Sequence, residues 1–111
     1  MDYPKSEKVR LIDWTNKLGD EITKCESENK VLEKELIDLK IEHNVTESKL
    51  EIIEDIDDRE SREFVCSIYK KEFIEEQKGL EREINVRAEK ITNNEERIKA
   101  NILIINNSNL Q

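Results

Sequence analysis

The chain has 111 residues, of which 27 are Asp or Glu and 19 are Lys or Arg, so its formal net charge is −8. Gly occurs twice, Pro occurs once and only 35% of the residues are hydrophobic. These values argue against a catalytic domain, because a compact core needs more apolar volume and tight turns need Gly or Pro. Long helices fit the composition. A disordered polyelectrolyte has a similar composition, but it predicts no regular spacing of apolar residues.

Residues 1–10 form an N-terminal cap segment. Pro4 suits the first turn of a helix, and either Asp2 or Ser6 can cap that helix. Acidic and basic residues alternate here, unlike the basic region of a DNA-binding zipper, so nucleic acid is not an expected partner. The sequence has no apolar stretch of a length that a signal peptide or a membrane span requires. We therefore expect an intracellular protein, cytoplasmic or nuclear, without membrane insertion.

Residues 11–53 form the first predicted coiled-coil segment. With Thr15 at heptad position a, an apolar row at position d runs from Leu11 to Ile53, which is typical of a coiled coil. The d positions are Leu11, Leu18, Cys25, Leu32, Leu39, Thr46 and Ile53. The a positions alternate between polar and apolar residues and are Thr15, Ile22, Asn29, Leu36, His43 and Leu50.

The heptad pattern falters in an irregular acidic segment at residues 54–66. The apolar row resumes at Cys66, which follows Ile53 by 13 residues and is thus one residue short of two heptads. Such a slip must change the supercoil locally. Phe64 widens the apolar surface, which suits contact with more than one partner helix. The same stretch also permits an antiparallel two-helix hairpin, although it lacks the Gly or Asn that a helix-helix turn normally uses.

Residues 67–105 form the second predicted coiled-coil segment. One row continues from Cys66 through Phe73 and Leu80, and a second row contains Ile84, Ile91, Ile98 and Ile105. The companion of this second row is either Leu80, Arg87, Asn94 and Asn101 or Ala88, Glu95 and Ile102. Apolar residues surround the helix at residues 102–105, which predicts a docking point, and residues 106–111 form a polar tail.

Four features of the sequence are candidates for chemistry or specificity. Asn29 either pairs with an Asn across a parallel seam and fixes its register or is a harmless polar residue in a loose layer. His43 lacks the neighbours that catalysis or metal binding needs, so we expect it to pack or to pair with a partner's carboxylate. Cys25 and Cys66 are expected to be buried thiols. The acidic cluster at residues 55–58 lacks the pattern of a calcium loop, so we expect no catalytic, cofactor or metal site.

The expected partner is a different helical chain. In a parallel homodimer, three of the five facing g and e pairs would join Glu to Glu, as in Glu21 with Glu26 and Glu28 with Glu33. Flanking charges select partners because all alternatives share the apolar seam. We therefore expect one or more coiled-coil proteins with basic flanking positions, and we expect a homodimer to be disfavoured.

The sequence predicts an all-α fold, in which a single helix from about residue 5 to about residue 105 forms an elongated, heteromeric coiled coil with a discontinuity near residues 54–66. The predicted function is a non-enzymatic structural or assembly subunit that scaffolds a larger complex. In composition, the heptad region resembles the small rod subunits of kinetochores, centrosomes, meiotic chromosome axes and membrane tethers. The alternative is a regulatory adaptor helix docked on an enzyme or motor. The predicted partner interface contains Leu11, Leu18, Ile22, Cys25, Asn29, Leu32, Leu36, Leu39, His43, Leu50, Ile53, Phe64, Phe73, Leu80, Ile84, Ile91, Ile98, Ile102 and Ile105.

Overall fold

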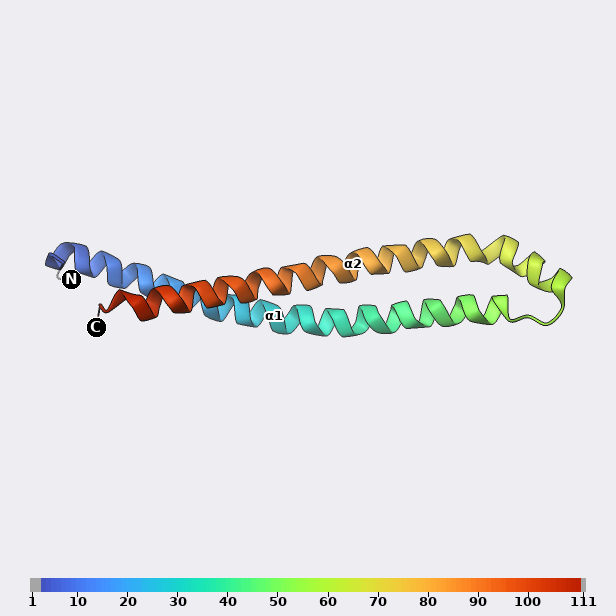
Figure 1. The fold of residues 1–111 in the computed structure, drawn as a ribbon, viewed down its shortest axis with the longest axis horizontal. Coiled ribbons are helices and arrows are strands. Elements are labelled where there is room, and N and C mark those ends of the chain that lie inside the picture. The colour runs from blue at the N-terminus through green and yellow to red at the C-terminus, as the bar shows by residue number, and fades with distance from the viewer. Residues whose placement is uncertain (1–2, 111) are drawn as a thin grey trace. The chain divides into compact units, whose positions relative to one another are not determined.

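Two long helices make up nearly all of the structure. The computed structural model describes residues 3–110, which contain helix α1 (Lys5–Glu54), helix α2 (Arg59–Ser108) and no strand (Figure 1). The helices are 50 residues each. The prediction of an all-α, elongated coiled-coil-like fold with a discontinuity near residues 54–66 is confirmed.

The expectation of one continuous helix is wrong, because the chain leaves the helix at residues 55–58. Asp58 starts α2: its carboxylate accepts hydrogen bonds from the backbone N–H of Ser61, at 2.9 Å, and from the Ser61 hydroxyl. The Arg62 guanidinium donates to the carbonyl of Ile56 at 3.0 Å and braces the loop. Aspartate favours turns and N-caps because its side chain bonds to nearby backbone N–H groups. The chain thus makes this connection without the Gly or Asn that we expected a hairpin to need.

The described residues form two compact units, of which the first is the loop unit, residues 33–89. Figure 1 shows its two helical segments, coloured from blue-green through yellow to orange, side by side and joined by the loop. Ion pairs fix their direction, because Glu54 lies near Lys70 whereas Glu35 lies near Arg87. Residues earlier in α1 therefore face residues later in α2, so the two segments are antiparallel.

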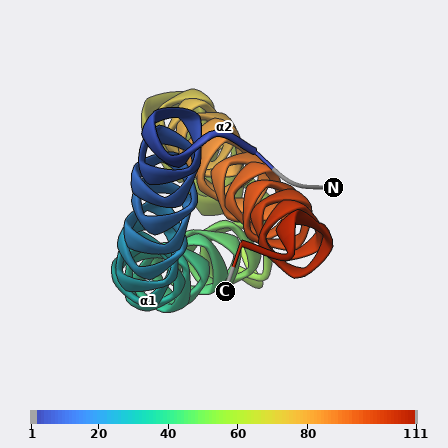
Figure 2. The ribbon, with the colours of Figure 1, turned by 90° about the vertical axis from the view of Figure 1, so that its left-hand side faces the viewer.

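The second unit, which we call the terminal unit, joins residues 3–32 to residues 90–110. Its two helical segments are seen end-on in Figure 2, with α1 in blue and α2 in red. Glu28 pairs with Lys90 and Glu21 pairs with Arg97, so these segments are antiparallel as well.

The outer ends of the helices have different terminations. The carbonyl of Pro4 accepts the first helical hydrogen bond from the N–H of Lys8 at 2.9 Å, so Ser6 lies inside α1 and is not its cap. The other expected cap, Asp2, lies outside the described residues. At the other end, Asn109 has a positive φ of 49° and terminates α2 in the left-handed conformation common at helix C-termini.

The core is a thin line of side chains between two helices. In the described residues, the only apolar side chains that are buried are Cys25, Leu32, Ile53 and Leu110. Most other seam residues are half-buried, because a single facing helix covers only one side of each. Three polar residues are also buried, namely Asn29, Thr46 and Asn101, so the specificity of the seam depends strongly on how they are satisfied.

Replacing Asp58 with Ala removes the N-cap of α2 and should lower the melting temperature at pH 7. Hydrogen bonds from the side chain and then the backbone of Ser61 hold the pKa of Asp58 below its ordinary value. The carboxylate therefore stabilises the fold above its unfolded-state pKa, and this contribution is lost as the pH falls through the lower folded-state pKa. We expect the difference between Asp58→Ala and wild type to shrink in acid, measured by thermal circular dichroism.

Asp58→Asn is the matched control, because Asn also caps helices but does not titrate. It should remain close to wild type at pH 7. Equal melting temperatures for Asp58→Ala and wild type at pH 7 would contradict the role of this cap.

Candidate protein-interaction surfaces

The seam between α1 and α2 contains most of the residues that the sequence assigned to a partner interface. All nineteen are buried or half-buried except Phe64 and Ile102, whose exposed fractions are 66% and 43%. These two residues point away from the facing helix, and their assignment to a partner interface stays a prediction. The remaining residues are covered by the other helix of the same chain.

The structure also identifies the second row of α2. Arg87 and Asn94 are half-buried and Asn101 is buried, whereas Ala88, Glu95 and Ile102 are exposed. The inward row therefore continues in unbroken steps of seven from Cys66 through Phe73, Leu80, Arg87, Asn94 and Asn101. The seven-residue spacing from Leu80 was the signal in the sequence that could have identified this row. The signal was hard to recognise because the next three residues of the row, Arg87, Asn94 and Asn101, are polar.

The 13-residue step from Ile53 to Cys66 does not change a supercoil. It spans the loop, and the two helices on either side of a loop need not share one heptad phase. The Cys66 thiol instead lies 3.8 Å from the carbonyl of Ile53, where the two helices meet.

Asn29 forms an Asn pair within the chain. Its side-chain oxygen accepts a hydrogen bond from the Asn94 amide at 2.8 Å, and its own amide donates to the carbonyl of Ile91 at 3.4 Å. The Asn94 amide also donates to Glu28 at 3.3 Å. A buried amide left without partners costs about 1–3 kcal/mol, so shifting one helix against the other would be penalised here. The layer therefore fixes the register of the terminal unit.

Other polar groups of the seam are satisfied in the same way. The amide of Asn101 donates to the carbonyl of Leu18 at 3.2 Å, and the hydroxyl of Thr46 donates to the carbonyl of Glu42, one turn earlier in its own helix, at 3.0 Å. In the described residues, no buried side-chain nitrogen or oxygen lacks a hydrogen-bond partner. The buried polar residues therefore specify the pairing without an unsatisfied group that would mark a ligand site.

His43 pairs with a carboxylate of its own chain. Its Nε2 atom lies 3.2 Å from Oε1 of Glu81 in the loop unit. The side chain of His43 is 19% exposed, and that of Glu81 is 55% exposed. The facing carboxylate that we expected from a partner protein is therefore present on α2.

The flanking charges of α1 and α2 are complementary. Three Glu residues lie seven apart on one flank of α1, and each pairs with a basic residue of α2. The row changes sign at Lys49, and the facing residue of α2 changes sign with it. The pairs are Glu21 with Arg97 at 2.6 Å, Glu28 with Lys90 at 3.9 Å, Glu35 with Arg87 at 2.9 Å and Lys49 with Glu76 at 3.8 Å. The basic flanking positions that we expected on a different protein are thus supplied by α2.

Arg87 is the most extensively bonded of these basic residues. Hydrogen bonds to Glu83 on its own helix and then to Glu35 on α1 raise the pKa of Arg87 above its ordinary value. The guanidinium stays charged and joins the two helices of the loop unit. Arginine suits this position because its planar group can bond two carboxylates at once.

Reversing two charges on the flank of α1 tests this complementarity. The double substitution Glu21→Lys with Glu28→Lys should destabilise the chain by about 1 kcal/mol, because exposed pairs contribute about 0.2–1 kcal/mol each. Salt should weaken the effect. Adding Lys90→Glu and Arg97→Glu to the same chain should restore the stability, measured by urea unfolding at low and high salt.

The rescue should be independent of protein concentration, because the paired residues belong to one chain. A rescue that appears only on mixing two differently charged chains would contradict pairing within the chain.

Apolar residues also lie on the side of α1 that faces away from the seam. In the loop unit, Ile37, Ile41 and Val45 are 60%, 55% and 49% exposed. They occupy heptad positions b, f and c, which point outward from a coiled coil, and their spacing of four places them on one face. We call these three residues the outer stripe. The pairing of α1 with α2 does not require them.

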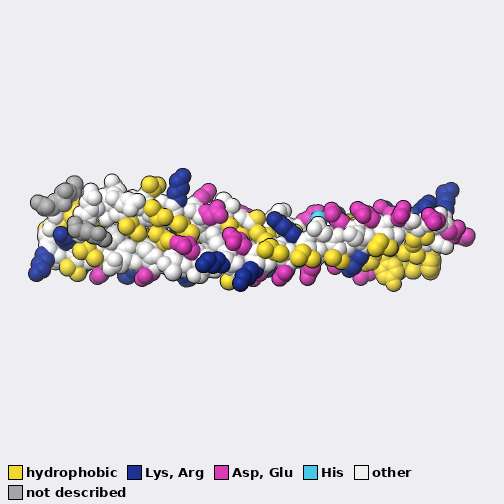
Figure 3. Space-filling view, turned by 90° about the horizontal axis from the view of Figure 1, so that it is seen from below, with side chains coloured by type: hydrophobic (Ala, Val, Ile, Leu, Met, Phe, Trp, Pro, Cys, Tyr) yellow, Lys and Arg dark blue, Asp and Glu magenta, His cyan; other side chains and the backbone are white. Residues whose placement is uncertain are grey.

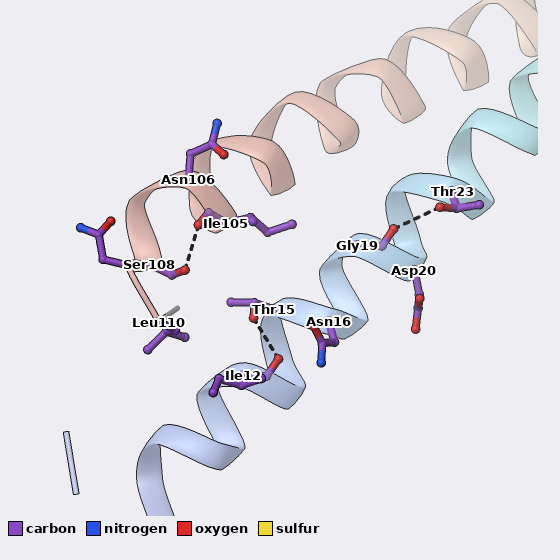
Figure 4. Close-up of a pocket in the computed structure, with 11 residues that line it drawn as sticks. Ile12, Thr15, Asn16, Gly19, Asp20, Thr23, Ile105, Asn106, Ser108 and Leu110 are labelled. Atoms are coloured by element: carbon purple, nitrogen blue, oxygen red, sulfur yellow. Dashed lines mark hydrogen bonds between the residues drawn. The ribbon is translucent and has the colours of Figure 1, made fainter. Parts of the chain in front are cut away.

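The terminal unit contains a groove of about 940 Å³ between the helix ends (Figure 4). Ile12, Ile105 and Leu110 contribute its apolar surface, and Asp20 is the one ionisable side chain among the residues that line it. The hydroxyls of Thr15 and Ser108 bond to carbonyls of their own helices at 2.9 and 2.8 Å. An isolated carboxylate without a paired base or nucleophile does not form a catalytic arrangement.

In residues 3–110, no group of three His, Cys, Asp or Glu side chains is placed to hold a metal ion. Neither helix is long and apolar enough to cross a membrane. Comparisons of the chain with protein-family models, curated proteins and solved structures gave no match.

Proposed function

We propose that the chain is a non-enzymatic coiled-coil assembly subunit that binds another helical protein and scaffolds a larger complex. The observation that carries this proposal is the outer stripe. The seam is covered within the chain, yet Ile37, Ile41 and Val45 remain about half exposed or more. Apolar residues spaced four apart on one helix face are the usual means by which a helix packs on a second protein.

The charge of the chain favours a basic partner. Each ion pair across the seam joins one acidic and one basic residue, so the pairs leave the net charge of −8 unchanged. The excess acidic groups therefore lie on outward surfaces, where they attract a partner with Lys or Arg beside its apolar residues. This partner is a different protein, because a second copy would bring the same excess of acidic groups.

In its finer form, the proposal places the chain among intracellular subunits, cytoplasmic or nuclear, of the kind that organise kinetochores, centrosomes, meiotic chromosome axes or tethers. Composition supports this class, and the paired helices suit a spacer between components. Because the helices shield each other, the chain does not need a host enzyme to cover its seam, which favours an assembly subunit over a regulatory adaptor.

The outer stripe is tested by replacing Ile37, Ile41 and Val45 with Ser in a tagged chain expressed in its native cells. Cross-linking and mass spectrometry should join the wild-type chain to a defined helical protein through residues near the stripe. The triple variant should lose these cross-links while circular dichroism shows that it remains helical. The matched control, Asn44→Ala with Ser48→Ala, should keep them.

Equal cross-linking by the triple variant and the control would contradict the role of the stripe. Cross-links from seam residues such as Leu32 to an enzyme or motor would instead support an adaptor that opens on its host.

A further inference from the structure

Hydrophobic side chains gather at the end of the loop unit where the loop lies (Figure 3). The strongly exposed apolar residues that flank this loop are Ile52 on the last turn of α1 and Phe64, Ile68 and Tyr69 on the first turns of α2. Their exposed fractions are 68%, 66%, 52% and 45%. We call these four residues the tip cluster.

The pairing of α1 with α2 does not account for the tip cluster. At this end the seam is covered by Ile53, which is 8% exposed, and by the half-buried Cys66 and Phe73. Phe64 and Ile68 lie four residues apart, and therefore on one face of α2, on the side away from the seam. Contiguous apolar groups of this kind on a surface commonly mark a binding site.

Tyr69 is held in place by its neighbours. Its ring stacks on the Phe73 ring, with a centroid separation of 5.7 Å and an angle of 18° between the two planes. The Lys49 ammonium lies 5.4 Å from the centroid of the same Phe73 ring. A ring fixed in this way loses little conformational freedom on binding, which favours its use as an anchor.

Negative charge is in excess in the loop and the first turn of α2, next to the cluster. Residues 54–63 contain six acidic and two basic residues. Both basic residues are already bonded, Arg59 to Glu63 and Arg62 to the carbonyl of Ile56. In the part of the chain that the structure describes, no ion pair involves the acidic residues Asp55, Asp57 and Glu60.

We propose that the tip cluster and these carboxylates bind a basic amphipathic helix of a partner protein. The apolar face of that helix would pack on Phe64, Ile68 and Tyr69, and its flanking Lys or Arg residues would pair with Asp55, Asp57 and Glu60. A second copy of this chain does not fit, because its tip carries the same negative charges. Anionic lipid and nucleic acid do not fit for the same reason.

The α2 part of this site, Phe64, Ile68 and Tyr69, lies on a different helix from the outer stripe, and the site rests on the proposed function only in taking the chain to be a binding protein. Val31 and Val86 supply the matched control, because they are aliphatic, 57% and 59% exposed and outside both the tip cluster and the outer stripe. Val31→Ser with Val86→Ser therefore removes similar apolar surface from a region that neither proposal uses.

The probe is a fluorescein-labelled, 18-residue amphipathic peptide of Leu and Lys, titrated with the full chain at physiological salt and read by fluorescence anisotropy. Phe64→Ser with Ile68→Ser should weaken binding about tenfold or more, because a few apolar anchors dominate such interfaces. Asp55→Asn, Asp57→Asn and Glu60→Gln together should weaken it and flatten its salt dependence. The control, Val31→Ser with Val86→Ser, should bind like wild type, with circular dichroism confirming that every variant is helical.

Three results would overturn the proposal. The first is no binding by the wild-type chain at 100 µM or below, about the upper end expected for a weak contact. The second is equal weakening by the Val31→Ser with Val86→Ser control, and the third is equal binding of a Leu and Glu peptide with the same spacing. None of them bears on the cross-links from the outer stripe, so the two proposals fail separately.

Discussion

The structure depends on one constraint: a line of apolar side chains seven residues apart must be covered by a single facing helix. The second half of the chain provides that helix by reversing direction at residues 55–58. With only one facing helix, most seam residues stay half-buried, and few side chains reach full burial. Each position therefore contributes modestly, and the pairing depends on many positions being in register.

Polar residues provide the register that a thin apolar seam lacks. Asn29 pairs with Asn94, and Asn101 bonds to the carbonyl of Leu18. The charge row adds direction, because its change from Glu to Lys at Lys49 is matched by Glu76 on the facing helix. A parallel pairing of two copies of the chain would place Glu beside Glu. The antiparallel pairing of α1 with α2 instead places Glu beside Lys or Arg. The polar and charged positions therefore determine the specificity of the helix pairing, and the apolar positions provide most of its stability.

Much of this could be predicted from the sequence, because the heptad positions from Leu11 to Ile53 are the ones that the structure covers. The heptad period alone does not indicate which helix covers this apolar row. The repulsion between Glu residues favours a basic facing helix, and α2 carries basic residues opposite Glu21, Glu28 and Glu35. The reversal of direction is hard to predict because Asp58, rather than Gly or Asn, starts the second helix. Phe64 and Ile102 lie outside the seam, at the wider apolar surface and the apolar helix end that the sequence predicts.

The central claim is that α1 and α2 of one chain cover each other in antiparallel orientation. Spin labels on Lys40→Cys and Asn85→Cys, with both native cysteines replaced by Ala, test it directly in the loop unit by dipolar electron paramagnetic resonance. Helix axes about 8–10 Å apart should keep the labels within about 20 Å, even when labelled chains are diluted with excess unlabelled chain. A separation near 70 Å, which the rise of about 1.5 Å per residue gives for one continuous helix, or a short distance that disappears on dilution, would contradict the account.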